Sequence, residues 1–395
     1  MKPNQTTLTI LVCLLALASS YGCKSLIKQK LPLTLQGRSQ ALQPGDIVDT
    51  RTGEIISFDK LFENLSKAKV VYVGETHTSI EDHQIQRRIL QSLYDGNPQL
   101  VVAMEMFPRH TQPVLDRYSS GLMSEQALIE EANWDEIWGH SFQFYRGILT
   151  WAGGKQLKIL ALNAPPEVVR KIGRNGLSSI TPQERSLIAE QIDLADSAHK
   201  EYVRQEYEQH VKENIKNFES FYEAQLAWEE TMAEALAQAI HSNNKLDQLV
   251  VLIGKGHIVQ SFGVPERTRR RAKHEYATIV PIPIDYPERQ IDPALADYVW
   301  ITKESTEHHH RGMLGVMVTP LANGGGLEIK GVVPNSPAAQ AGVKPGDVLY
   351  CFDGKPVSDI ADIHQALAEG TTATHALGVK RGGKAMKLQV TLSPR

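Results

Sequence analysis

Two stretches, VVYVGETH at residues 70–77 and VVLIGKGH at residues 250–257, decide the fold of this 395-residue chain. Each is an apolar run that ends in Gly-x-x-His. Three further apolar runs occupy residues 100–104, 158–162 and 278–284. Nearly continuous Val, Ile and Leu over such lengths is typical of strands buried on both faces, as in parallel sheets covered by helices. The sequence therefore predicts an α/β fold with a parallel-sheet core.

Helical patterns separate these runs. Ser79 and the acidic residues after it have the pattern of a capping box, and Ile85, Ile89 and Leu93 form the apolar stripe of the helix that it opens. Residues 181–241 begin with Thr-Pro-Gln-Glu, a helix start, and are then charged and free of proline. This segment is too long for a simple crossover, so we expect a long helical insertion packed over the sheet.

Five ionisable side chains lie at or just after the predicted strand ends: Glu75, His77, His83, Glu105 and His257. Ligands of open parallel sheets bind beyond the carboxyl ends of the strands, so we expect these residues to gather at one rim. Imidazoles and carboxylates together suit a borderline divalent metal, whereas an imidazole or phenolate can ligate haem iron. The alternative is structural: histidines bonded to backbone and glutamates capping helices. Spacing alone leaves these interpretations open.

The N-terminus has the pattern of an export signal. Lys2 precedes an apolar run at residues 8–18, and small residues lead to Cys23. This resembles a bacterial lipoprotein signal, with an ordinary secretory signal as the alternative. We expect residues 1–22 to be removed and Cys23 to be lipidated, anchoring the protein at the periplasmic face of the outer membrane, because Lys and not Asp follows the cysteine. Residues 24–45 are predicted to form a polar tether.

Charge excludes one class of partner. With a net charge of −3, the chain has no overall attraction for nucleic acid. The basic stretch at residues 266–271 is expected to be a solvated helix face, and haem propionates or anionic lipid headgroups are its alternative partners.

Five ordered blocks resemble the ChaN-like family of haem-binding uptake proteins, over about residues 44–285. They are VYVGETHTSIEDHQIQ, VVAMEMFPRHTQPVLDRY, ILALNAPPEVVRKIGRNGL, FYEAQLAWEETMAEAL and VVLIGKGHIVQSFGVPER. One departure is Glu229, where relatives usually have Asp. The resemblance implies an iron-linked, periplasm-facing lipoprotein that binds haem through Tyr and His of the helical region, and it allows a homodimer. The candidates are His199, Tyr202, Tyr207 and, preferred, His210.

The same residues are similar to the Tiki and TraB group, which includes metal-dependent proteases. That resemblance implies an alternative function, that of a metal-dependent hydrolase or peptidase. His77, His257 and a carboxylate would hold zinc or manganese, and Glu75 or Glu105 would take a proton from bound water.

Residues 311–395 resemble a bacterial-type PDZ domain, a small β-sandwich or barrel with helices. Gly312, Met313, Leu314 and Gly315 match its carboxylate-binding loop, and the strand after them would bind a protein C-terminal tail by β-augmentation. A PDZ fold with no open groove is the alternative. Cys351 is expected to be a small buried hydrophobe. We predict a haem-binding domain over residues 24–305, a linker between residues 285 and 312, and this C-terminal domain.

Overall fold

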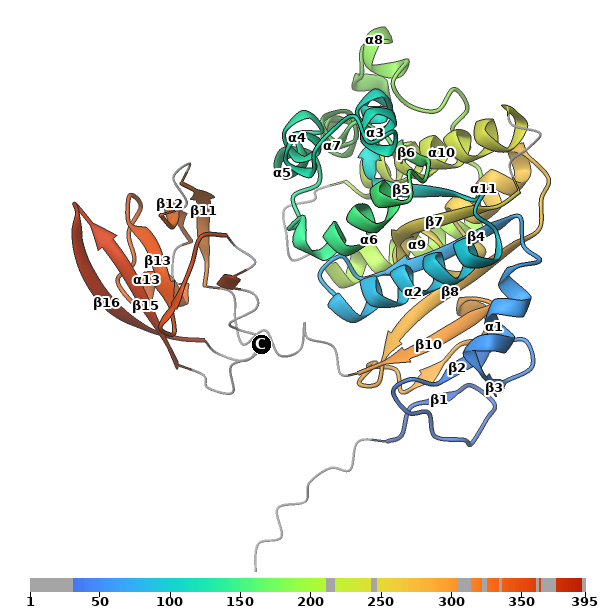
Figure 1. Cartoon of the computed structure of the whole chain (residues 1–395), viewed down its shortest axis with the longest axis horizontal. Coiled ribbons are helices and arrows are strands. Elements are labelled where there is room, and N and C mark those ends of the chain that lie inside the picture. Colours follow the sequence, from blue (N-terminus) through green and yellow to red (C-terminus); the bar gives the residue numbers. More distant parts are fainter. Residues whose placement is uncertain are drawn as a thin grey trace, which may run out of the picture. The chain divides into compact units, whose positions relative to one another are not determined.

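The computed structural model of the chain describes residues 31–210, 217–242, 247–303, 314–321, 325–333, 336–359, 362–363 and 374–392. An eight-stranded sheet with the order β3-β2-β10-β8-β4-β7-β5-β6 lies in the part before residue 303 (Figure 1). Its strands are β2 (Ile47–Asp49), β3 (Glu54–Ile56), β4 (Val70–Glu75), β5 (Val101–Pro108), β6 (Ile159–Asn163), β7 (Leu249–Gly254), β8 (Tyr276–Pro283) and β10 (Tyr298–Thr302). All five predicted apolar runs are strands of this sheet.

The sheet is mostly parallel. From β10 to β6 every neighbouring pair is parallel, whereas β2 is antiparallel to both β10 and β3. The predicted α/β class is confirmed. The antiparallel edge is a difference from the prediction, because β2 and β3 have only three residues each and carry little periodic signal.

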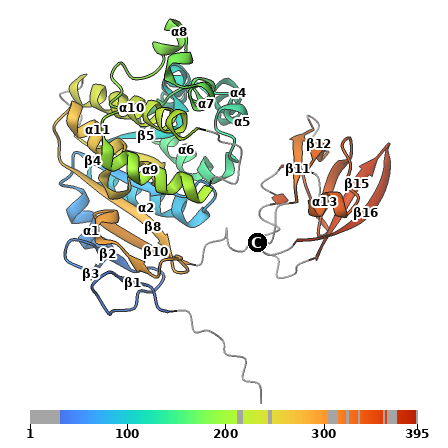
Figure 2. The ribbon, with the colours of Figure 1, turned by 180° about the vertical axis from the view of Figure 1, so that it is seen from behind.

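Both faces of the central strands are buried. Val71 and Val73 of β4 belong to a core with residues of α1, α2 and α6, whereas Val70 and Tyr72 belong to a core with residues of α10 and α11. Figures 1 and 2 show these two helical layers from opposite sides. Burial of alternate side chains on two faces is the physical reason for the continuous apolar runs in the sequence.

Helices connect the strands. The α-helices before residue 303 are α1 (Phe58–Leu65), α2 (Ile80–Gly96), α3 (Gln112–Ser119), α4 (Glu125–Glu131), α5 (Trp134–Ile137), α6 (Gln143–Gly154), α7 (Pro166–Asn175), α8 (Pro182–Arg185), α9 (Ser197–His210), α10 (Phe218–Ser242) and α11 (Val264–Arg271). Short 3₁₀ turns are η1 (Arg109–Thr111), η2 (Leu177–Ser179), η3 (Lys255–His257), η4 (Val259–Ser261) and η5 (Pro293–Leu295). Within the described ranges, none of the helices combines the length and apolar character that a membrane span requires.

The predicted helical insertion is divided. Thr181 caps α8 through a full capping box, as expected, but α8 ends after one turn and α9 begins only at Ser197. The long helix α10 packs on the sheet, as expected of this segment, but it is not an insertion. Its residues Met232 and Leu236 are part of the core against the sheet, so α10 is an integral crossover helix.

Two predicted connecting segments are wrong in part. Residues 285–303 are not a linker, because they contain β9 (Gln290–Ile291) and β10, and β10 pairs with both β8 and β2 inside the main sheet. The N-terminal tether is also shorter than predicted. β1 (Thr34–Leu35) pairs with β9, and Leu33, Leu35 and Leu42 are buried.

A second, antiparallel sheet follows in the C-terminal part, with the order β11-β12-β13-β15-β16 and β14 paired to β13. Its elements are β11 (Val316–Pro320), β12 (Leu327–Val332), α13 (Pro337–Gln340), β13 (Val348–Phe352), β14 (Lys355–Pro356), β15 (Thr374–Arg381) and β16 (Lys384–Thr391). The apolar core of this sheet includes Leu314, Phe352, Ile363 and Val379. This small β domain agrees with the predicted fold class.

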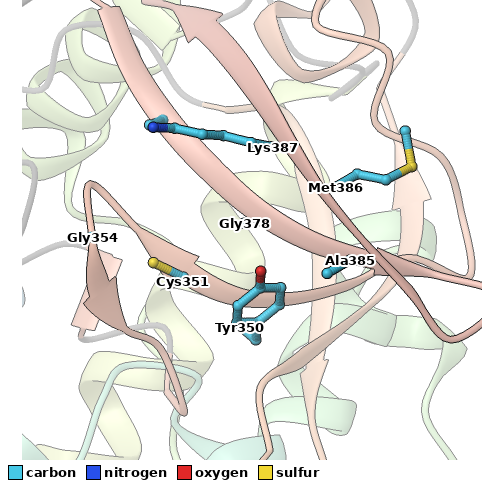
Figure 3. Close-up of a pocket in the computed structure, with 8 residues that line it drawn as sticks. Tyr350, Cys351, Gly354, Gly378, Ala385, Met386 and Lys387 are labelled. Atoms are coloured by element: carbon cyan, nitrogen blue, oxygen red, sulfur yellow. The ribbon is translucent and has the colours of Figure 1, made fainter.

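One surface of this sheet carries a pocket of about 390 Å³ (Figure 3). It is lined by Tyr350, Cys351, Gly354, Ala376, Gly378, Ala385, Met386 and Lys387. Cys351 is only half-buried, so the expectation of a buried position is wrong. The adjacent residues Tyr350 and Cys351 both line the pocket, because the pairing of β13 with β15 shifts register between Leu349 and Cys351.

Candidate functional site

Three neighbouring strands end at the same edge of the main sheet. β7 lies between β4 and β5, and Glu75 at the end of β4 is level with Gly254 at the end of β7. Glu105 lies on β5, and the 3₁₀ turn after β7 carries His257. The structure therefore brings the two Gly-x-x-His motifs and both glutamates to one rim, because all three strands run in parallel.

Glu75 is the buried centre of the first half of the rim. Its Oε1 accepts hydrogen bonds from His77 Nδ1 at 2.7 Å and from the Tyr145 hydroxyl at 3.0 Å. His83 Nδ1 lies 2.8 Å from the other carboxylate oxygen. Burial alone would raise the pKa of Glu75, but the bonds from His77 and His83 lower it to about 2. Glu75 is thus an anion held by two imidazoles, whose own pKa values it raises against the effect of burial.

His77 is the member of this group that reaches solvent. Its side chain is 33% exposed, compared with 4% for His83. The His77 ring contacts two aromatic neighbours from the segment between α5 and α6: Trp138 at 4.9 Å and His140 at 4.8 Å between ring centroids. The rim therefore has an accessible surface made of imidazole and indole rings.

Glu105 and His257 form the second half. Glu105 is fully buried, and its Oε2 accepts the backbone N–H of Gly254 at 2.6 Å. His257 Nε2 lies 3.4 Å from Glu105 Oε1, and its Nδ1 lies 3.2 Å from Glu229 Oε1. Burial would lower the pKa of His257, but these two carboxylates raise it to about 10. An imidazolium therefore links the strand end to α10.

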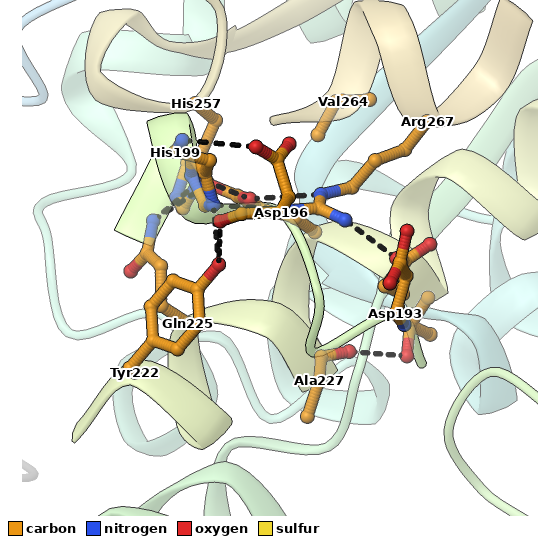
Figure 4. Close-up of polar contacts among 12 residues, drawn as sticks. Asp193, Asp196, His199, Tyr222, Gln225, Ala227, His257, Val264 and Arg267 are labelled. Carbon is orange, nitrogen blue, oxygen red and sulfur yellow. Dashed lines mark hydrogen bonds and ion pairs between the residues drawn. The ribbon is translucent and has the colours of Figure 1, made fainter. Parts of the chain in front are cut away.

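A buried ion network continues from Glu229 (Figure 4). Glu229 Oε2 lies 3.2 Å from both Arg267 Nε and His199 Nε2. Arg267 also donates to Glu230 at 2.6 Å and to His199 Nδ1 at 3.0 Å. Burial would raise the pKa of Glu229, but His199 and His257 lower it well below its usual range. Glu229, at the position where relatives usually have Asp, thus contacts two histidines and an arginine, and the Gln225 amide donates to its Oε1 at 2.8 Å.

The basic stretch on α11 is mainly an internal counter-charge, which corrects the predicted solvated face. Arg267 is buried, and Arg270 and Arg271 lie 2.9 Å and 2.5 Å from the fully buried Glu230. Arg269 remains at the surface and pairs with Glu266. Three of the arginines therefore compensate a carboxylate that has no contact with water.

The predicted haem candidates on α9 differ in exposure. His199 is buried, with both ring nitrogens held by the network above. Tyr202 and Tyr207 are half-buried, and the Tyr207 ring lies 5.4 Å from Phe218 and 5.3 Å from Phe221. His210 ends α9, and its side chain is outside the described residues. Their role as haem ligands stays a prediction.

Comparison with known families decides the classification. Residues 61–268, more than half of the chain, match the family described as "Haem-binding uptake, Tiki superfamily, ChaN". The chain belongs to this ChaN family. Residues 328–381 match the PDZ domain family, so the ChaN-type domain is followed by a PDZ domain.

Similar proteins cover parts of the chain. A solved structure entitled "Cofacial heme binding to ChaN of Campylobacter jejuni" has a TM-score of 0.52 and 21% identity, covering 65% of this chain and 98% of that one; at this identity it shows the shared fold. Protein RETICULATA-RELATED 5 of Arabidopsis thaliana is 22% identical over 262 residues, 61% of this chain and 35% of that protein. The periplasmic endoprotease DegQ of Escherichia coli is 33% identical over 93 residues, 21% of this chain and 20% of DegQ. The chain thus spans about a third or less of these two curated relatives.

Metal binding by the ChaN-type rim stays a prediction. In the part of the chain that the structure describes, no group of three or more His, Cys, Asp or Glu side chains is arranged to hold a metal ion. Glu75, His83, Glu105 and His257 instead pair with one another or with neighbours. Glu105 Oε1 is buried and has no hydrogen-bond partner among the described residues, although the His257 ring is near.

The predicted peptide-binding loop of the PDZ domain is described in part. Leu314 is buried in the core, and Gly315 has a positive φ of 75° with its carbonyl accepting from Val333 N–H at 2.8 Å. Gly312 and Met313 lie outside the described residues, as does the predicted lipidation site Cys23. β11, which follows the loop, is an edge strand of its sheet.

Sequence reasoning missed several residues of the ChaN-type site. Tyr145, Trp138 and His140 come from α6 and the segment before it, and Arg267 and Glu230 come from helices on the other face. Arg267 lies in a charge run, a pattern that predicts a surface position. His140 does not follow a predicted strand, so the strand-end argument that indicated Glu75 and His77 could not indicate it.

Proposed function

We propose that this protein is an exported, lipid-anchored haem-binding protein of the uptake type, whose PDZ domain recruits a partner by its C-terminal tail. The observation that carries the proposal is the match of residues 61–268 to the haem-binding uptake family. Haem would be the cargo of such a protein, and its contacts would come from α9 and the start of α10.

The residues of this surface have the chemistry that haem requires. Tyr207 supplies a phenol group, which is a known type of haem-iron ligand, next to the rings of Phe218 and Phe221. The Arg204 guanidinium lies 3.9 Å from the Phe218 ring centroid, and its side chain is 40% exposed. Arg204 and the neighbouring Lys200 can pair with the propionates of haem, while the aromatic rings pack against its apolar plane.

Haem titration of the full chain tests this proposal. We expect a saturable Soret band that is weakened by Tyr207→Phe and by His210→Ala. The matched control is Tyr94→Phe, which removes a half-buried phenol from α2, on the other face of the sheet. Absence of a saturable Soret change in the natural chain would reject haem binding. A band unaltered in both variants would reject these ligands.

The PDZ part of the proposal rests on the open edge of β11. An edge strand offers unpaired backbone groups to an extended peptide, and Leu314 and Ile363 belong to the adjoining apolar core. We therefore expect tails with an apolar last residue. Calorimetric titration with a library of C-terminal peptides measures this directly, with the same peptides amidated at the C-terminus as the control.

Anchoring is supported by the pattern around Cys23 and by the periplasmic location in the name of DegQ, which shares the PDZ segment. Expression of the natural chain and of Cys23→Ala in a bacterial host with a labelled fatty acid provides the test. Label and membrane association should both disappear in the variant. Cleavage without labelling of the natural chain would instead indicate an ordinary secretory signal.

A further inference from the structure

Two imidazoles from different segments meet at the accessible part of the rim. His77 follows β4, His140 lies between α5 and α6, and their ring centroids are 4.8 Å apart with the planes tilted by 45°. The Trp138 ring stands edge-on to His77 at 4.9 Å and lies 5.4 Å from His140. The indole thus restricts both rings.

In the other two imidazoles of the rim, both ring nitrogens already have polar partners within the protein. His83 is engaged by Glu75 and Gln86 through Nδ1 and by the His77 carbonyl through Nε2. His257 is engaged by Glu229 and Glu105. In contrast, neither His77 Nε2 nor either ring nitrogen of His140 has a hydrogen bond or ion pair with another described residue. Two imidazole rings that carry unpaired nitrogens therefore lie side by side.

Glu75 prepares His77 as a ligand. The bond of 2.7 Å from His77 Nδ1 to Glu75 Oε1 fixes the ring orientation and leaves Nε2 as the nitrogen available to an ion. A buried carboxylate behind a histidine is the usual arrangement that orients metal-bound imidazoles and increases their basicity. The Tyr145 hydroxyl bonds to the same oxygen of Glu75 and holds the carboxylate in place.

The distance between the rings distinguishes two kinds of ligand. Metal–nitrogen bonds of about 2.0 Å place two imidazole centres about 5 Å apart when they are neighbours on one ion. Imidazoles on opposite sides of a haem iron would be about 6 Å apart. The observed 4.8 Å agrees with the first arrangement.

We propose that His77 Nε2 and a ring nitrogen of His140 bind one zinc-like divalent ion, with water in the remaining positions and Glu75 as the orienting carboxylate. Imidazole nitrogens select this class of metal. The site differs from the predicted set, because Glu75, His83, Glu105 and His257 are not its ligands and His140 is new. It does not depend on haem binding at α9.

Zinc titration of the full chain tests the proposal. Because His308, His309 and His310 would bind zinc adventitiously, every protein in the comparison carries Ser at these three positions. We expect one zinc per chain in this background and at least a tenfold loss of affinity in His77→Ala and in His140→Ala. His140→Phe retains a ring and should lose affinity equally. His110→Ala, at an exposed histidine of η1, is the matched control and should bind as the background does.

Copper EPR of the same proteins counts the ligands. Two imidazole nitrogens are expected in the background and one in His140→Phe, with unchanged melting temperatures. Absence of zinc binding in the background, or undiminished binding in either His140 variant, would overturn the proposal. Loss in His77→Ala alone would assign the ion to a set without His140 and would equally overturn it. The Soret titration is unaffected by all of these outcomes, so failure of haem binding is recorded separately.

Discussion

Glu105 Oε2 accepts the backbone N–H of Gly254 at 2.6 Å, which fixes a fully buried carboxylate of β5 against the end of β7. Gly254 is the first residue of the second Gly-x-x-His motif, so this bond ties that motif to β5. A Cβ atom added at Gly254 would stand 2.8 Å from His77 Cε1 and 3.3 Å from Glu105 Oε2. The glycine is therefore required by the close approach of His77 and Glu105, and not by its backbone conformation.

Gly254→Ala should destabilise the protein and displace His77. Overpacking by one methyl group in a tight site costs about 1–3 kcal/mol. Urea unfolding measures this cost. The control is Gly256→Ala in the same turn, where an added Cβ meets nothing within 4 Å. Equal stability of the two variants would show that the rim adapts to the methyl group.

Glu229→Gln should lower the denaturant concentration at which the protein unfolds well below that of the natural chain, because it weakens the buried ion network. The substitution keeps the shape of the side chain but leaves Arg267 and His257 with one carboxylate fewer in a buried site. Removing one partner of a buried ion pair typically costs about 3–5 kcal/mol. Glu266→Gln, which breaks the surface pair with Arg269, should have little effect. Similar unfolding midpoints for both would contradict the role assigned to Glu229.

Stability should fall on the alkaline side because of His257. Its pKa is raised from 6.5 to about 10, so its charged form stabilises the fold fully below pH 6.5 and this contribution is lost as the pH rises towards 10. A tenfold change in a proton-binding constant corresponds to about 1.4 kcal/mol. We expect the free energy of unfolding to decrease over this range in the natural chain and to change less in His257→Gln. Parallel curves would assign the decrease to other groups.

The free energy of unfolding should also decrease at acid pH, because Glu75 loses its charge there. Its pKa is lowered from 4.5 to about 2, so its stabilising charge is present above pH 4.5 and is lost as the pH falls towards 2. Glu75→Gln should flatten the acid limb of the urea-unfolding profile. An acid limb as steep as that of the natural chain would contradict this assignment.

Gly315→Ala should abolish peptide binding by the PDZ domain. Gly315 has φ of 75°, and an added Cβ would lie 2.2 Å from the Ser336 Cβ. Gly342→Ala is the matched control, because φ there is 81° but nothing lies within 4 Å. The control should lose about 1–2 kcal/mol of stability from the left-handed backbone alone and retain peptide affinity. Retained affinity in Gly315→Ala would separate this loop from the binding site.

The strands of the α/β core could be predicted from sequence because burial on two faces leaves continuous apolar runs, as in β4 and β7. β10 was missed, although its Tyr-Val-Trp-Ile-Thr sequence is apolar, because prolines precede it and only its pairing with β8 and β2 makes it a strand. The rim residues Glu75, Glu105 and His257 could be predicted in turn, since parallel strands end at one edge.

The sequence by itself determined the alternation of strands and helices, the strand-end position of the two Gly-x-x-His motifs, and the PDZ-like C-terminal part. Only the tertiary structure decided which imidazoles form ion pairs with buried carboxylates and which remain accessible to solvent. His140 meets His77, and Arg267 meets Glu229, through the packing of helices on opposite faces of the sheet. Such contacts depend on how separate segments pack, whereas strand periodicity and strand-end position are local properties of the chain.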